Sequence, residues 1–274
     1  MESVAGKRVL ITGAAMGLGR LYAERAVAEG ATDVIVWDIN EAAMSETVAD
    51  LEAAGGRVHS YIVDVSDRDA ITAAAEQVLA EVGAPHILIN NAGVVSGNAY
   101  FWECDPVKDV EFTMSINALA PMHITRAFLP GMIATGQDCR VVTMASAAGL
   151  TSNPRLAAYC ASKWAAVGFS DSVRLELEQA GHHQVKVTTV CPYYIKTGMF
   201  EGAKSALLLP LLEPEDVARD VWKAMLKGHA MLVLPKTVLL NEIVKGVLPT
   251  PLRDFLAGKV FGVHKTMEDF TGRR

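Results

Sequence analysis

Residues 8–19 read RVLITGAAMGLG, a short apolar run followed by a turn that holds three glycines. The apolar run is typical of a buried strand, and the residues from Gly17 to Ala28 favour a helix. Glycines at such a strand-to-helix turn let the backbone approach a pyrophosphate, which the N-terminus of the helix then stabilises. Because strand, turn and helix come in the order that this contact requires, we favour a dinucleotide-binding turn over an ordinary tight turn.

The rest of the chain repeats this alternation of short β-branched runs and longer helical stretches. Strands are expected at Arg8–Ile11, Val34–Trp37, His59–Val63, Ile87–Asn90, Val141–Met144, Lys186–Val190 and Met231–Leu234. Helices are expected at Gly17–Ala28, Glu41–Ala53, Asp67–Glu81, Val107–Ile133, Ala157–Gln179 and Pro214–Lys227. The pattern predicts an α/β fold, a doubly wound and mostly parallel seven-stranded sheet with helices on both faces. Since no repeat or linker interrupts it, we expect a single domain at residues 1–235 with a C-terminal extension at residues 236–274.

Composition excludes several classes of protein. With 274 residues, 51% of them hydrophobic, the chain can bury a sizeable core and is not disordered, and a net charge of −6 argues against a general nucleic-acid surface. Cys104, Cys139, Cys160 and Cys191 lack C-x-x-C spacing, which favours unpaired thiols in a reducing cytoplasm and no metal site. An apolar strand is reached by Val9, and no stretch of 18 uncharged apolar residues follows. We therefore expect no signal peptide and no spanning helix.

Polar residues follow the next strands of the expected sheet. Asp38 comes nineteen residues after Gly19, where a carboxylate can accept hydrogen bonds from ribose hydroxyls and repel a 2′-phosphate. The sequence therefore favours NAD(H) over NADP(H), and a solvated turn residue is the alternative interpretation of Asp38. Asp64 and Val65 follow the third strand, where they either reach an adenine or form a loop turn. Residues 90–93 read NNAG, which suits the floor of a cofactor crevice or a plain turn.

Tyr159 and Lys163 lie four residues apart on an expected helix, and Ser146 lies thirteen residues before the tyrosine. Residues i and i+4 share a helix face, so the phenol and the ammonium can point into one site. A nearby cation favours the ionised phenol and makes the tyrosine an acid/base near neutral pH, while Ser146 can hold a substrate oxygen. The pattern alone is weak, because a half-buried tyrosine beside a solvated lysine has the same spacing.

Together these motifs resemble those of the short-chain dehydrogenase/reductase family: T-G-x-x-x-G-x-G, N-N-A-G, and a serine with Y-x-x-x-K, in the family's order. The resemblance covers about residues 4–234 and implies an extended Rossmann fold with NAD(P)-linked alcohol and ketone chemistry. It implies that Tyr159 is the acid/base, that Lys163 lowers the pKa of this tyrosine and holds the nicotinamide ribose, and that Ser146 orients the substrate oxygen. Asn117 matches the family's fourth catalytic position, which helps to hold a proton-relaying water.

The residues discussed above and those that the resemblance adds give one set of expected cofactor contacts. They fall on Gly13, Met16, Gly17, Leu18, Gly19, Asp38, Ile39, Asp64, Val65, Asn91, Ala92, Gly93, Tyr159, Lys163, Pro192, Ile195 and Thr197. The residues expected to line the substrate pocket are Tyr193, Met199 and Phe200.

A narrower likeness points to one branch of the family. Residues 37–40 (WDIN), 159–169 (YCASKWAAVGF), 197–200 (TGMF) and 212–217 (LEPEDV) are similar to those of the epidermal retinol dehydrogenases and the lipid-droplet 17-beta-hydroxysteroid dehydrogenases. Those proteins usually begin with a hydrophobic membrane anchor, which we expect this chain to lack. Tyr193 stands where most of the wider family has a glycine after the proline, a change that the branch tolerates.

The sequence thus predicts an NAD-dependent oxidoreductase that interconverts a bulky hydrophobic alcohol, steroid- or retinoid-like, with its ketone or aldehyde. The apolar segment at residues 197–213 is expected to cover the substrate, with ordinary packing as its alternative. The alternative function is an NADPH-dependent carbonyl reductase of the same fold. A non-catalytic dinucleotide-sensing protein is disfavoured, because all four catalytic positions are filled.

The extension at residues 236–274 is apolar to about residue 263, with interspersed lysine and arginine. It either packs as a helix or at an oligomer contact, or it meets a membrane surface or a lipid substrate. We expect a homodimer or homotetramer formed through the helices at Val107–Ile133 and Ala157–Gln179. The expected partner is a hydrophobic small molecule, with no nucleic acid, no spanning segment and at most a peripheral membrane contact.

Overall fold

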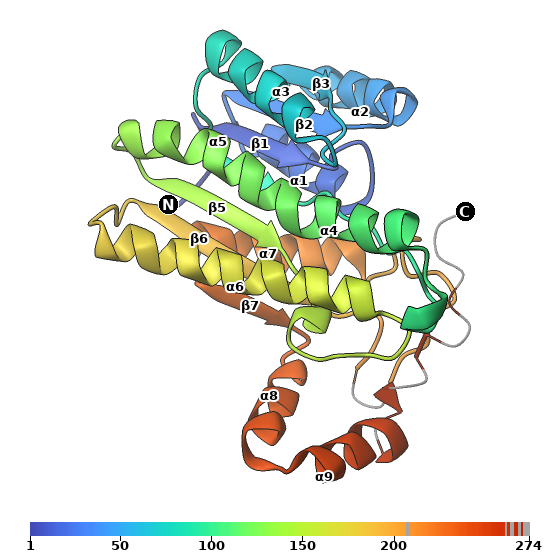
Figure 1. Ribbon diagram of the computed structural model, residues 1–274. Helices are drawn as coiled ribbons and strands as arrows, with labels where there is room; N and C mark the ends of the chain where they lie inside the picture. The colour runs from blue at the N-terminus through green and yellow to red at the C-terminus, as the bar shows by residue number, and fades with distance from the viewer. Residues whose placement is uncertain (207–208, 261, 264–265, 268–269, 271–274) are drawn as a thin grey trace.

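The computed structural model describes residues 1–206, 209–260, 262–263, 266–267 and 270. Its centre is a seven-stranded sheet in the order β3-β2-β1-β4-β5-β6-β7, with every neighbouring pair parallel (Figure 1). The strands are β1 (Arg8–Thr12), β2 (Asp33–Asp38), β3 (Val58–Ile62), β4 (Ile87–Asn90), β5 (Cys139–Met144), β6 (Val185–Pro192) and β7 (Met231–Leu234). The strand order reverses between β1 and β4, and ligands bind at the carboxyl edge beside such a switch point. The predicted fold class is confirmed.

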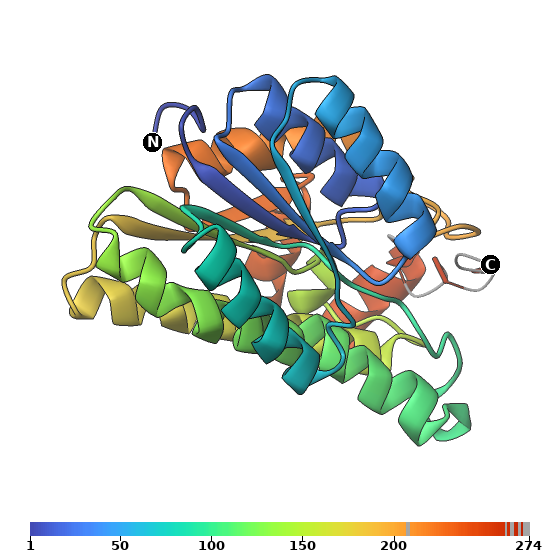
Figure 2. The same cartoon turned by 90° about the horizontal axis from the view of Figure 1, so that it is seen from above.

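Helices cover both faces of the sheet, as Figure 2 shows from above. They are α1 (Gly17–Ala28), α2 (Glu41–Ala53), α3 (Arg68–Glu81), α4 (Phe112–Met114), α5 (Ala120–Ala134), α6 (Ala157–Gln179) and α7 (Pro214–Lys227). Side chains of α1, α2 and α7 share one buried cluster with the sheet, and those of α3, α5 and α6 share another. The sheet is therefore the middle layer of three.

Both faces of the central strands are buried, which explains why their sequences are apolar throughout. In β1, Val9 and Ile11 belong to the cluster under α1, whereas Leu10 belongs to the opposite cluster. On that second side Phe128 of α5 is fully buried, and its ring centroid lies 5.7 Å from that of Trp37 in β2. This aromatic pair joins α5 to the sheet beside the carboxyl edge.

The expected helix at Val107–Ile133 is divided into four segments. Two of them are π-helical, η2 (Pro106–Glu111) and η3 (Ser115–Leu119), and they alternate with α4 and α5. In an α-helix the N–H of residue 121 would donate to the carbonyl of Asn117, four residues earlier, but Pro121 has no N–H. The π-helical segment η3, with its hydrogen bonds between residues five apart, ends just before this proline. The prediction of one uniform helix is corrected for this reason. π segments of this kind are frequent at functional sites.

The C-terminal extension leaves the sheet after β7 and projects from the body of the protein (Figure 1). It contains α8 (Val238–Val247), α9 (Thr250–Phe255) and the π-helical η5 (Leu256–Val260). Thr266, further along, is buried and accepts a hydrogen bond from the side chain of Asn153 at 3.0 Å. Among the described residues, no helix combines the length and the apolar character that crossing a membrane requires.

Replacing Phe128 with alanine is expected to lower the free energy of unfolding by about 3–5 kcal/mol, because buried apolar contact is lost and a cavity remains. Urea denaturation followed by circular dichroism measures this change. Leu79→Ala on α3, where the side chain is exposed, should change the free energy by less than about 0.5 kcal/mol. A loss at Phe128 no larger than that of the control would contradict its place in the core.

Candidate active site

The carboxyl ends of the strands open into a cleft of about 420 Å³. The cofactor residues predicted from the sequence that line it are Gly13, Met16, Gly17, Leu18, Asp38, Ile39, Asp64, Val65, Asn91, Ala92, Gly93, Tyr159, Lys163, Pro192, Ile195 and Thr197. Ser146 and the predicted substrate residues Tyr193, Met199 and Phe200 line the same cleft. The structure thus brings residues from six strand ends and from α6 into one site.

The glycine turn is held by backbone contacts that leave no room for side chains. Gly13 has a φ of +64°, and a Cβ at this position would lie 2.9 Å from the Cα of Ala92. A Cβ on Gly19 would lie 2.0 Å from the carbonyl oxygen of Gly13, yet Gly19 does not line the cleft. Gly19 therefore lies behind the turn, where it lets α1 pack closely against it. The backbone at Gly13 and Gly17 is left bare toward the cleft, as an approaching pyrophosphate requires.

The N-N-A-G segment fastens this turn to β4. The hydroxyl oxygen of Thr12 accepts hydrogen bonds from the N–H groups of Asn91 and Ala92, both at 3.0 Å. The side-chain amide of Asn91 donates to the carbonyl oxygens of Thr12 at 2.9 Å and Gly13 at 3.1 Å. The motif thus fixes the floor of the cleft as well as lining it.

Asp38 lies at the end of β2 and holds the turn from the other side. Its carboxylate accepts the N–H of Ala15 at 2.9 Å and the N–H of Asn40 at 3.0 Å. Each carboxylate oxygen has further lone-pair capacity, so the group can still accept ribose hydroxyls. Among the described residues that line the cleft, Lys163 is the sole cation, and it belongs to α6 rather than to the β2 end. Of these described lining residues, none is a cation beside Asp38 that could hold a 2′-phosphate.

Tyr159, Lys163 and Ser146 are buried together where α6 meets the end of β5. The tyrosine is 3% exposed and the lysine 5%, so the alternative of a solvated lysine beside a half-buried tyrosine is wrong. The Lys163 ammonium donates to the carbonyl oxygen of Met144 at 2.9 Å and lies 5.7 Å from the centre of the Tyr159 ring. Ser146 accepts the N–H of Ala148 at 3.1 Å, and its hydroxyl donates to the carbonyl oxygen of Pro192 at 3.5 Å.

Burial dominates the acidity of these groups. It raises the pKa of the Tyr159 phenol above its ordinary value, and the hydrogen bond from Ser146 opposes that shift only in part. Burial also lowers the pKa of the Lys163 ammonium to about 8. Without a cofactor, the pKa of Tyr159 is therefore raised and not lowered as the sequence predicts, because loss of hydration is the largest influence on the phenol.

Asn117 lies in η3 and is buried beside this group rather than on the cleft wall. Its side-chain oxygen accepts the N–H of Val94 at 2.9 Å, and its amide donates to the carbonyl of Val94 at 2.8 Å and to the hydroxyl of Ser162 at 3.2 Å. These hydrogen bonds hold the backbone segment that follows Gly93 in place. The side chain of Asn117 is therefore engaged in holding the site together.

A second, apolar cavity of about 120 Å³ adjoins the cleft and shares Ser146 and Tyr193 with it. Leu209, in the segment expected to cover the substrate, is part of its lining. Sequence reasoning missed most of the others, which include Asn153, Leu156, Tyr194, Thr237, Val238, Leu240, Arg253, Leu256, Ala257 and Val263. Seven of these residues belong to the C-terminal extension, and the apolar character of that segment was the only signal of them in the sequence. Tyr194 of the cavity and Phe200 of the cleft pack against each other where the two spaces meet, with ring centroids 4.8 Å apart.

Comparison with known proteins gives a consistent result. The model of the family described as short chain dehydrogenase matches residues 7–207. Epidermal retinol dehydrogenase 2 of Mus musculus is 41% identical over 276 residues, covering 100% of this chain and 88% of that protein. Estradiol 17-beta-dehydrogenase 11 of Rattus norvegicus is 40% identical over 259 residues, covering 94% and 85%.

Solved structures agree with these relatives. A short-chain dehydrogenase/reductase from Burkholderia phymatum in complex with NAD has a TM-score of 0.81 and 28% identity, covering 90% of this chain and 95% of that one. A metagenomic short-chain oxidoreductase in complex with NADP has a TM-score of 0.72 and 30% identity, covering 84% and 96%. Neighbours of this fold thus include proteins that hold either dinucleotide.

Gly19→Ala is expected to weaken dinucleotide binding by about tenfold or more, because the new Cβ would overlap the Gly13 carbonyl and displace the turn. Quenching of protein fluorescence by NADH measures the affinity. Gly168→Ala on α6 is the matched control, since nothing lies within 4 Å of a Cβ there. If both variants bound NADH as the unchanged protein does, the close packing of α1 on the turn would not matter for the site.

Proposed function

Since the chain belongs to the short-chain dehydrogenase family, whose members are oxidoreductases, we propose that it interconverts a bulky hydrophobic alcohol and its ketone or aldehyde with NAD(H). The observation that carries this proposal is the place of Ser146, which lines both the polar cleft and the apolar cavity. A substrate oxygen held at Ser146 has Tyr159 beside it, the dinucleotide cleft on one side and apolar space on the other. That geometry suits hydride transfer at a hydrophobic carbinol carbon.

The residues of the cleft fit a dinucleotide along the carboxyl edge of the sheet. The bare backbone at Gly13 and Gly17 suits a pyrophosphate at the N-terminus of α1, and Asp38 suits the ribose hydroxyls of NAD(H). Lys163, whose ammonium lies 3.5 Å from where a Cβ on Gly93 would be, suits the nicotinamide ribose. The bound nicotinamide supplies the hydride chemistry, whereas the protein supplies position and electrostatics.

Tyr159 acts as the acid/base on the substrate oxygen, and Ser146 holds that oxygen by a hydrogen bond. To take the proton of an alcohol the phenol has to be ionised, whereas burial favours its neutral form. The Lys163 ammonium favours the phenolate, and a bound oxidised nicotinamide would add positive charge to the same site, so Tyr159 would act as a base mainly in the complex. Asn117 supports the proton path through its backbone carbonyl, because its side chain is committed to Val94 and Ser162.

The apolar cavity supports a large hydrophobic substrate. Its wall is formed by aliphatic and aromatic side chains around a few polar groups, and Met199 and Phe200 close the adjoining cleft. Two similar proteins are named for retinol and for estradiol. A steroid- or retinoid-like alcohol is therefore the substrate class that we propose, and burial of its apolar surface would supply much of the binding free energy.

We further propose a homodimer or homotetramer built on α6, which presents the exposed side chains of Trp164 and Leu175. The four free cysteines are compatible with a reducing cytoplasm.

Tyr159→Phe should lower kcat for alcohol oxidation by about 10²-fold or more, because the ring remains and the acid/base is lost. Oxidation by the unchanged enzyme should rise with pH as the phenolate fraction grows, and the variant should lose that dependence. NADH affinity, measured by fluorescence, is expected to stay within about threefold, which separates chemistry from binding. Oxidation by Tyr159→Phe at a near wild-type rate would rule out the assigned role.

Asp38→Asn removes the charge at the ribose end and keeps an oxygen to accept the N–H of Ala15. The unchanged protein should bind NADH more tightly than NADPH, and the variant should shift the ratio of the two affinities toward NADPH by about tenfold. Asp64→Asn, a second cleft carboxylate, serves as the control and should leave the ratio nearly unchanged. Tighter NADPH binding by the unchanged protein would instead favour the alternative of an NADPH-dependent carbonyl reductase.

A further inference from the structure

We propose that residues 236–260, here called the docking arm, bind an anionic lipid surface and admit a lipid-dissolved substrate from it to the apolar cavity. The docking arm contains α8, α9 and η5 and projects from the body on the side of β7 (Figure 1). The proposal rests on the proposed function for what enters the cavity. The docking itself is independent of turnover.

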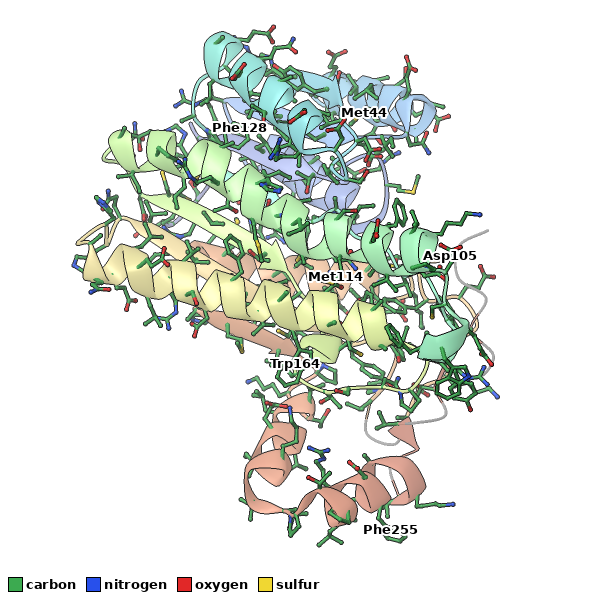
Figure 3. The ribbon with its side chains drawn as sticks, viewed as in Figure 1. Met44, Asp105, Met114, Phe128, Trp164 and Phe255 are labelled. Atoms are coloured by element: carbon green, nitrogen blue, oxygen red, sulfur yellow. The ribbon has the colours of Figure 1, made fainter. Side chains whose placement is uncertain are left out.

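The outer face of the docking arm is apolar. On α8, Leu239, Ile243 and Val247 recur every four residues and therefore share one helix face. Ile243 is 64% exposed and Val247 75% exposed. On α9, Phe255 is 57% exposed, and Figure 3 places it on the outer side of the arm, away from the sheet. Apolar side chains gathered on one face of adjoining helices are the arrangement that lies in a lipid interface.

The charges of the docking arm favour anionic headgroups. The arm holds four basic and two acidic residues, in a chain whose net charge is −6. Within the described residues Lys245 pairs with Glu242, and Arg253 pairs with Asp254. The other two basic residues of the docking arm are Lys236, which lies before α8, and Lys259, which lies in η5. Each basic residue near an anionic surface contributes on the order of 1 kcal/mol to binding.

The inner face of the docking arm is a wall of the apolar cavity. Leu240 of α8 and Leu256 and Ala257 of η5 line that cavity together with Ser146. The arm is fastened to the body through Lys245, which donates to the carbonyl of Leu150 and lies 4.6 Å from the centre of the Trp164 ring. A lipid surface bound on the outer face would thus lie across the docking arm from the apolar cavity.

A second copy of the chain fits the docking arm less well. If two arms met across a two-fold axis, two segments that each hold four basic and two acidic residues would face one another. Like charges brought together in an apolar contact are unfavourable. An anionic lipid surface meets the same residues with opposite charge.

Sedimentation of the full chain with phosphatidylcholine vesicles, with and without phosphatidylserine, tests the proposal. We expect binding to both and tighter binding when phosphatidylserine is present. The double change Ile243→Glu and Val247→Glu should lower the partition coefficient by about tenfold or more. Ile62→Glu on β3, an apolar position that is 52% exposed at the sheet edge opposite β7, should leave it unchanged. Lys236→Gln with Lys259→Gln should reduce binding only to the vesicles that contain phosphatidylserine.

Two further measurements keep the outcome unambiguous. NADH affinity of each variant reports that the fold is intact and does not depend on the docking arm. Analytical ultracentrifugation reports whether the glutamate variant changes the mass of the protein in solution. Absence of vesicle binding by the unchanged protein, or equal binding by the glutamate variant, would overturn the proposal. So would a lower mass of that variant with unchanged vesicle binding, which would make the arm a contact between copies.

Discussion

A buried ammonium determines the geometry of the site. Lys163 of α6 donates to the carbonyl of Met144, the last residue of β5, at 2.9 Å. A charge is tolerated in the interior only where partners compensate its lost hydration, so this bond ties the helix to the end of the strand. Tyr159 lies one turn earlier on the same helix, and Ser146 follows Met144 by two residues. Strand end and helix start thus bring the three groups to the cleft.

The site joins two environments of different polarity. On one side the bare glycine backbone and Asp38 offer hydrogen bonds to a polar ligand, while on the other Ser146 opens onto an apolar cavity. The docking arm forms the far wall of that cavity. Under the proposed function, the cofactor would occupy the polar cleft and the hydrophobic substrate the apolar cavity, and Ser146 lines both.

The sequence carried the parts of this arrangement that depend on local pattern. Continuous apolar runs located the buried strands, and Asp67 marked the start of α3, where its carboxylate accepts the N–H groups of Asp69 and Ala70. Such local patterns could not predict contacts between segments that are distant in the sequence. The reversal of the Tyr159 pKa shift depends on burial, the place of Gly19 behind the turn depends on α1 packing, and the cavity wall depends on how the extension folds back. Pro121, by contrast, could have indicated from the sequence that the helix expected at Val107–Ile133 is interrupted, although the apolar pattern runs through it.

We propose that Tyr159 is a poor base in the protein alone and becomes a base when NAD⁺ is bound. Ultraviolet difference titration of the phenol, taken between the unchanged protein and Tyr159→Phe, measures the pKa of this one group directly. In the absence of NAD⁺ the pKa should lie above the ordinary value of about 10, and saturating NAD⁺ should lower it by at least about one unit. An unchanged pKa in the two states would contradict the account.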